Sequence, residues 1–554
     1  MEPGKYRDRS RTLENLRMVF PGPRSWAGGC LSASTKIQME VSVKLRSSFL
    51  AAAAVAVGMG LAAAPVQAGK SDDTLNWATD REVSIVDPYY NRTRELVVMG
   101  HLGWDTLVFR DIASGEFKPL LATKWEWKDD KTLIVDLRDD VKFHDGSAFD
   151  ADDVVYTINH VTNKDNGVVT YSNVKYMKSA EKLGDYKVQI NLHNPFPATI
   201  AYLAGAVFMM PSGHYDSAPA KPDGTKDYSK VNPNGTGPYK WKETKSGEYV
   251  LWEKNADYFN GEKGKPSIGK VKFRTIKEMN TQIAELLTGG VDWIWDVPKD
   301  QAERLESQGQ VTVENAKTMR VSYIAFDVDG SSPSKQFKDK KVRMAVAHAI
   351  NREAITKNLV GPASVVIHSP CHPDQFGCTD DVPKWSYDPE KAKALLKEAG
   401  YPDGFETEIG AYRQREYTEA VIGDLAKIGI KAKLNFMQYR ALRDLAWKGE
   451  TAMHHMTWGS NSIPDADAIT GVFFSGGKDD PADDPEVNEA IKAAGTTVDS
   501  DKRKELYKKA MSKIAGELYW LPMFTYAKYY AFSKDLDFKP TSDEIPRFYS
   551  AKWK

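Results

Sequence analysis

The sequence predicts an α/β protein with at least two lobes. Its 554 residues exceed what one hydrophobic core holds, because single cores stop growing near roughly 250–300 residues. Apolar residues alternate with polar ones over 132–137 and 188–192, which indicates half-buried strands. Over 417–436 an amphipathic helix pattern leads directly into an alternating strand pattern, as is typical of an α/β lobe. We therefore expect several lobes that combine helices with sheet.

Helix punctuation supports this assignment in the second half of the chain. Asp388 suits an N-cap, Pro389 suits the first helical position, and Gly400 suits a helix end, which together predict a helix between them. One-sided apolar spacing predicts further helices over 150–161 and 341–355.

Composition excludes some classes of protein. Hydrophobic residues make up 41% of the chain and charged residues 27%, values typical of a soluble globular protein. The formal net charge is -1, whereas a nucleic-acid-binding protein needs a basic face to neutralise phosphates. We expect no nucleic-acid partner.

An export signal is predicted near the start of the chain. Lys44 and Arg46 precede an apolar stretch over 49–64, and small residues follow up to Ala68. This pattern predicts a signal peptide over 39–68 that is cleaved after Ala68. A membrane anchor is the alternative, but the stretch is short and rich in Ala and Gly. Residues 1–38 lack periodicity, and we interpret them as a non-native or unstructured extension.

The exported chain keeps two cysteines, Cys371 and Cys378. Two cysteines in an exported protein favour one disulfide, because the compartment is oxidising. A zinc site formed with His368 and His372 is the alternative interpretation.

Several segments carry a resemblance to a known family. The segment VKFHDGSAFDADDVVYTI closely resembles the signature of the dipeptide- and oligopeptide-binding family of ABC importers, which is family 5, cluster C, of the extracellular solute-binding proteins. Further similar segments follow in the expected order, namely NGTGPYKW at 234–241, NADYFNGEKGKPSIGKVKFR at 255–274, KVRMAVAHAINREAI at 341–355 and LLKEAGYPDGF at 395–405.

The resemblance implies a two-lobed periplasmic binding protein of class II, with an extra inserted α+β subdomain in the first lobe. The implied parts are a first lobe at 69–108, 231–321 and 528–554, an inserted subdomain at 109–230, and a second lobe at 322–527. The chain would cross a hinge near 320–323 and again near 525–530. Ligand would bind between the lobes, and hinge closure would present it to the ABC permease in the inner membrane. We expect a monomer that binds a peptide-like, opine-like or sugar-derived molecule.

An exported hydrolase is the alternative from another class. The sequence contains no GxSxG elbow, HExxH helix or GxxxxGK loop. His454 and His455 are adjacent, so on a strand they point to opposite faces and do not bind one ion together. We therefore expect no catalytic residue and no cofactor. A metal-complex or haem binder of the same fold remains a second alternative.

Site residues follow from the resemblance. Arg415 matches the family position that binds a ligand carboxylate, and a solvent-facing arginine is the alternative. Trp458 fits a family tryptophan, but Asn461 stands where an acidic partner for the ligand ammonium is expected; Asp465 or Asp467 would have to replace it. The remaining candidates are Tyr90, Arg92, Arg94 and Arg413. Because a buried ammonium needs a paired anion, we expect an anionic or neutral polar ligand rather than an ordinary dipeptide.

Overall fold

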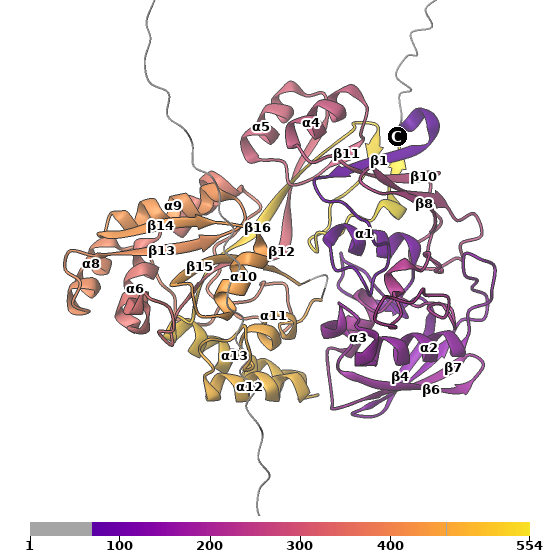
Figure 1. The fold of residues 1–554 in the computed structure, drawn as a ribbon, viewed down its shortest axis with the longest axis horizontal. Coiled ribbons are helices and arrows are strands. Elements are labelled where there is room, and N and C mark those ends of the chain that lie inside the picture. The colour runs from indigo at the N-terminus through magenta and orange to yellow at the C-terminus, as the bar shows by residue number, and fades with distance from the viewer. Residues whose placement is uncertain (1–68, 461–462) are drawn as a thin grey trace, which may run out of the picture. The chain divides into compact units, whose positions relative to one another are not determined.

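A computed structural model describes residues 69–460 and 463–554 (Figure 1). The predicted extension at 1–38, the predicted signal peptide at 39–68 and Asn461 lie outside the described residues. Among the residues described, no helix is both long and apolar enough to cross a membrane.

One ten-stranded sheet runs through the structure. Its central strands are β12 (Thr312–Phe326) and β16 (Trp520–Phe532), which pair antiparallel along most of their length. The pairing register shifts between Lys317 and Val321 and again between Ser322 and Tyr323, so the ladder is irregular near the middle of the pair. Figure 1 shows these two strands side by side between the parts of the chain that hold β13 and β1.

The other eight strands lie on the two sides of this central pair. On one side the order is β15, β13, β14, and these are Met453–Gly459, Phe405–Ala411 and Ile430–Phe436. On the other side the order is β11, β1, β10, β9, β8, and these are Trp293–Ile294, Thr74–Thr79, Lys270–Thr275, Tyr249–Lys254 and Tyr239–Lys245.

A separate four-stranded sheet has the order β4-β5-β7-β6. Its strands are Ala122–Asp129, Thr132–Leu137, Lys187–Leu192 and Met177–Gly184. Helix α2 (Ala151–Thr162) packs on β6 and β7, and Asp150 caps it by accepting from the Asp152 backbone N–H. The short pairs β2–β3 (Val108–Arg110, Phe117–Pro119) and β17–β18 (Leu536–Asp537, Lys552–Trp553) complete the strands.

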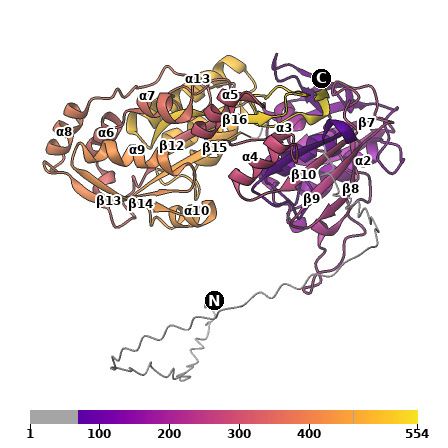
Figure 2. The same cartoon turned by 90° about the horizontal axis from the view of Figure 1, so that it is seen from above.

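The helices cover the sheets, and Figure 2 shows α6, α8 and α9 close to β13 and β14. Besides α2, the helices before β12 are α1 (Arg94–Gly103), α3 (Thr199–Gly205), α4 (Met279–Thr288) and α5 (Lys299–Gln308). Those after β12 are α6 (Lys340–Ala349), α7 (Arg352–Ile355), α8 (Pro389–Glu398), α9 (Arg415–Ala426), α10 (Tyr439–Trp447), α11 (Asp467–Phe473), α12 (Pro485–Thr496) and α13 (Ser500–Glu517).

The buried residues show the two lobes. One large core draws on residues 75–295 and 530–551, and two other cores draw on residues 321–527. Ile463 and Ala468 are exceptions, since they lie in the second half of the chain but pack into the first core. The two-lobed α/β fold is thereby confirmed, while the lobe and subdomain boundaries given above stay predictions.

The predicted helix over 341–355 is wrong in one respect, because it is interrupted. Helix α6 ends at Ala349 and α7 begins at Arg352. Between them, the Asn351 side chain accepts from the Ala354 backbone N–H, and the Asn351 backbone N–H donates to Asp424. Asn351 therefore starts a new helix instead of continuing the first one.

Candidate functional site

A cluster of charged side chains surrounds the central strand pair. We call it the charge cluster, and it consists of Arg94, Asp296, Arg320, Arg413, Lys528 and Glu544. Its members come from α1, β12, β16 and three connecting segments. Sequence separation between them reaches 450 residues, for Arg94 and Glu544.

Glu544 is the most buried member, with its side chain 1% exposed. Arg94 Nη2 lies 3.1 Å and Arg320 Nη2 3.0 Å from Glu544 Oε2, and Lys528 Nζ lies 3.7 Å from Oε1. Burial alone would raise the pKa of Glu544, but Arg320, Lys528 and Arg94 outweigh burial and hold the pKa well below its usual range. Glu544 is therefore ionised at neutral pH.

Asp296 is the second carboxylate of the cluster. It directly follows β11 and Trp295, and it contacts Lys528 Nζ at 3.2 Å and Arg413 Nη2 at 3.4 Å. Arg413 lies between β13 and α9, so the contact between Asp296 and Arg413 joins the first-lobe core region to the second. The Arg413 guanidinium also lies 5.9 Å from the centre of the Tyr526 ring.

The cluster has more positive than negative charge. Within the described part of the chain, four cations contact two carboxylates directly, an excess of two positive charges when Lys528 is protonated. Burial lowers the pKa of Lys528, yet with this lysine neutral the three arginines still outnumber the two carboxylates. The cluster can accept further negative charge.

Arg415 lies outside this cluster. Its side chain is 58% exposed, its Nε donates to Glu419 at 2.7 Å, and its guanidinium lies over Phe436. Arg415 therefore faces solvent, which was the alternative to a carboxylate-binding position. Its role in binding stays a prediction, and Arg413, two residues earlier, is the arginine of this segment that lies in the charge cluster.

Asp465 is held by another partner. Its two carboxylate oxygens accept from Arg503 Nη1 and Nη2 at 2.7 and 2.8 Å, and both side chains are almost fully buried. Arg503 also lies over the Phe376 ring. Because this bidentate pair occupies both oxygens, Asp465 is poorly placed to bind a ligand ammonium.

Asp467 links the two lobes. Its Oδ2 accepts from the Tyr202 hydroxyl at 3.4 Å, and Tyr202 lies on α3. Burial, and then the nearby Asp465 charge, raises the pKa of Asp467 to about 6. Trp458 lies near the end of β15, nine residues before Asp467, and its ring meets the Phe473 ring edge-on.

The N-terminal candidates separate in the structure. Arg94 belongs to the charge cluster, whereas Arg92 is exposed. The Tyr90 hydroxyl bonds to His160 at 2.9 Å, and the Tyr90 ring stacks on Tyr228. Their ligand contacts stay predictions.

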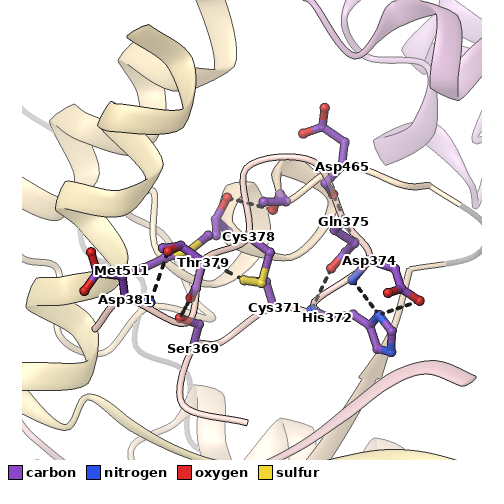
Figure 3. The surroundings of a disulfide bond; sticks show 12 residues. Ser369, Cys371, His372, Asp374, Gln375, Cys378, Thr379, Asp381, Asp465 and Met511 are labelled. Carbon is purple, nitrogen blue, oxygen red and sulfur yellow. Dashed lines mark hydrogen bonds and ion pairs between the residues drawn. A yellow bond between two sulfur atoms is a disulfide. The ribbon is translucent and has the colours of Figure 1, made fainter. Parts of the chain in front are cut away.

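A disulfide joins Cys371 to Cys378, as predicted (Figure 3). The zinc alternative is therefore wrong, because the two sulfur atoms bond to each other. The enclosed loop holds the segment over 463–466: Gln375 Nε2 donates to the carbonyls of Ile463 and Asp465 at 3.2 and 3.0 Å, and the Phe376 backbone N–H donates to Pro464. The loop thus fixes the chain directly before α11.

The adjacent histidines have structural partners. His455 bonds to Ser322 and Thr418, and His454 bonds to Thr451. Within the described ranges, no group of three or more His, Cys, Asp and Glu side chains is arranged to hold a metal ion.

Comparison with known proteins connects this site to a family. The family of bacterial extracellular solute-binding proteins, family 5 (middle region), matches residues 116–481. The chain belongs to this family. Family 5 proteins are extracellular solute-binding proteins, so the chain is a solute-binding protein of this kind.

A similar relative within family 5 is the glutathione-binding protein GsiB of Salmonella paratyphi A. It is 30% identical over 443 residues, which cover 76% of this chain and 82% of the relative.

Solved structures share the family 5 fold. The dipeptide-binding protein of Pseudoalteromonas sp. SM9913, in complex with Met-Leu, has a TM-score of 0.75 and 24% identity and covers 87% of this chain and all of its own. The ABC transporter-associated periplasmic binding protein DppA of Helicobacter pylori, in complex with a peptide, has a TM-score of 0.74 and 24% identity, covering 87% of this chain and 99% of its own.

Sequence reasoning missed four members of the charge cluster as site residues, namely Asp296, Arg320, Lys528 and Glu544. Arg320 and Lys528 lie in the two predicted hinge segments, and this position could have pointed to them as candidates. No local pattern marks Asp296 or Glu544, because their partners are distant in sequence.

Proposed function

We propose that this protein captures a small solute bearing at least one carboxylate, and that Arg413 binds this carboxylate between the lobes. The observation that carries the proposal is the excess of positive charge in a largely buried cluster drawn from both core regions. A planar guanidinium suits the role, because its paired donors match a carboxylate. The contacts of Arg413 to Asp296 use only Nη2, so Nε and Nη1 can each donate to the solute, and a two-point contact would also involve Nη2.

Glutathione and N-blocked peptides are the solute classes that we favour. GsiB is named for glutathione, and glutathione carries two carboxylates, which suits a cluster with surplus positive charge. Glutathione also carries an ammonium, and this group is less well served, since Asp465 is paired with Arg503 and Asp467 accepts from Tyr202, so the carboxylates would carry most of the binding. Solute contacts made from both lobes would then favour closure by their differential affinity.

We further propose that the protein acts as a monomer, that it binds its solute without chemical conversion, and that the exported form begins at Gly69. The relatives named above are binding proteins, which supports the absence of turnover. N-terminal sequencing of the exported protein should give Gly69 as the first residue. Retention of residues 39–68 would contradict the signal-peptide assignment.

Substitution of the two neighbouring arginines tests the carboxylate site. We expect Arg413→Ala to weaken binding of glutathione or N-acetyl-Met-Leu by about 2 kcal/mol or more, roughly thirtyfold, because the bound carboxylate loses its charged partner. Arg415→Ala should change the affinity by less than about twofold, since exposed ion pairs contribute little. Isothermal titration of the wild type and both variants measures the difference.

The two variants form a matched pair, because both remove an arginine from the same short segment. Circular dichroism and thermal unfolding should show that each variant is folded. A larger loss for Arg415→Ala than for Arg413→Ala would place the carboxylate on Arg415 and contradict the proposal.

A further inference from the structure

The Asp296 carboxylate contacts one nitrogen of Arg413, the arginine on which the proposed function rests. Its two oxygens lie 3.4 and 3.5 Å from Arg413 Nη2. Any solute carboxylate that binds the guanidinium therefore meets a second carboxylate at the same group.

The contact between Asp296 and Arg413 is loose compared with other ion pairs in the protein. Normal N–H···O hydrogen bonds span about 2.7–3.2 Å. Arg503 reaches Asp465 at 2.7 and 2.8 Å, and Arg320 reaches Glu544 at 3.0 and 3.2 Å, so both fall within that range. The distances from Asp296 to Arg413 lie beyond it. A ligand carboxylate with better geometry can displace this contact.

The backbone holds Asp296 in place beside the arginine. Its φ is 56°, in the left-handed region that residues other than glycine seldom adopt. Lys528 Nζ contacts both carboxylate oxygens at 3.2 Å, so the side chain keeps a buried cation whether or not Arg413 stays in contact. The Asp296 side chain is 34% exposed, which leaves space for another group beside it.

We propose that Asp296 is a specificity-determining residue of the solute site: its carboxylate competes with that of the solute for Arg413. The inference rests on the proposed function of Arg413. A solute with a well-placed carboxylate overcomes the competition, because it can form a two-point contact with Nη2 and either Nη1 or Nε, whereas Asp296 reaches Nη2 alone. A neutral solute gains nothing from displacing Asp296. Asp296 thus favours solutes whose carboxylate binds Arg413 more tightly than the Asp296 carboxylate does.

Charge removal at Asp296 tests the inference. Asp296→Asn keeps the shape of the side chain, and asparagine tolerates a left-handed backbone. We expect the variant to bind N-acetyl-Met-Leu about three- to tenfold more tightly than the wild type, because a partly exposed like charge is removed. Its affinity for N-acetyl-Met-Leu-amide, which lacks the carboxylate, should stay unchanged. Isothermal titration of both probes gives the comparison.

Asp111→Asn is the matched control. Asp111 is 30% exposed and contacts a lysine, Lys118, at 3.1 Å, but it lies outside the charge cluster. This control should leave both affinities unchanged. Asp296→Gly is a second variant that removes the charge and fits the backbone, so a folding defect specific to the asparagine variant does not decide the result.

The outcomes separate the two proposals. If Arg413→Ala weakens binding of the acid while neither Asp296 variant strengthens it, the competition is refuted and the carboxylate site stands. If the wild type binds acid and amide equally, or binds neither of them nor glutathione, the carboxylate site fails and the competition fails with it. Equal strengthening of acid and amide by Asp296→Asn also refutes the competition.

Discussion

Replacement of Glu544 by glutamine is expected to lower the free energy of unfolding by about 3–5 kcal/mol, the usual effect of removing one partner from a buried ion pair. The reason is that Arg94, Arg320 and Lys528 all contact this carboxylate. Glutamine keeps the shape of the side chain but leaves these cations without their shared counter-charge. Urea unfolding of the wild type and the variant measures the difference.

The dependence on pH gives a second signature of Glu544. Its pKa is depressed in the folded state, so its contribution is fully present above the pKa of an unfolded glutamate, about 4.3, and declines as the pH falls below that value towards the folded pKa. Stability of the wild type should therefore fall more steeply than that of Glu544→Gln below about pH 4.3. Parallel curves would contradict the assigned charge state.

Glu285→Gln is the control for Glu544→Gln. Glu285 also pairs with an arginine, Arg274, but both side chains are 30% exposed. Its loss should cost no more than about 1 kcal/mol, because solvent screens exposed pairs. If both variants lowered the free energy of unfolding equally, burial of Glu544 would not explain its effect on stability.

Arg503→Leu should lower the free energy of unfolding by a similar amount, about 3–5 kcal/mol, because it leaves the buried Asp465 carboxylate without its cation. The double variant Arg503→Leu with Asp465→Asn should recover part of the loss, since the uncompensated charge is then gone. Thermal and urea unfolding of the single and double variants measure both effects. Arg415→Leu, at an exposed ion pair, is the control and should stay within about 0.5 kcal/mol of the wild type.

The same variants decide the role of Asp465. If its carboxylate held a ligand ammonium, Asp465→Asn would weaken binding of Met-Leu with little change in stability. The bidentate pair with Arg503 predicts the opposite result, a large loss of stability. A stable Asp465→Asn variant with impaired binding of Met-Leu would therefore restore the sequence-based assignment.

Local sequence patterns predicted many elements of the fold. Strand β5 spans Thr132–Leu137 and β14 spans Ile430–Phe436, both as the alternation indicated. Helix α8 begins after the Asp388 cap, whose side chain accepts from the Lys391 backbone N–H. These features depend on neighbouring residues, and so one sequence reveals them. The interruption near Ile350 was missed, because the Asn351 backbone contacts Asp424, which is distant in sequence.

The site was harder to predict than the fold. Arg413 and Arg415 are two residues apart and have the same chemistry, yet one contacts Asp296 and the other faces solvent. The family pattern pointed to Arg415. No local sequence pattern tells which of the two arginines reaches Asp296. The outcome depends on where β13 ends and α9 begins, and on which distant residues lie next to the segment between them.

The sequence by itself determined the two-lobed α/β class, the family, and the pairing of Cys371 with Cys378. These follow from chain length, local periodicity, ordered motifs and the presence of two cysteines after the predicted signal peptide. Only the tertiary structure decided which charges meet. Glu544 contacts Arg320 from 224 residues away and Asp296 contacts Arg413 from 117 residues away, and Coulomb attraction depends on distance in space rather than along the chain.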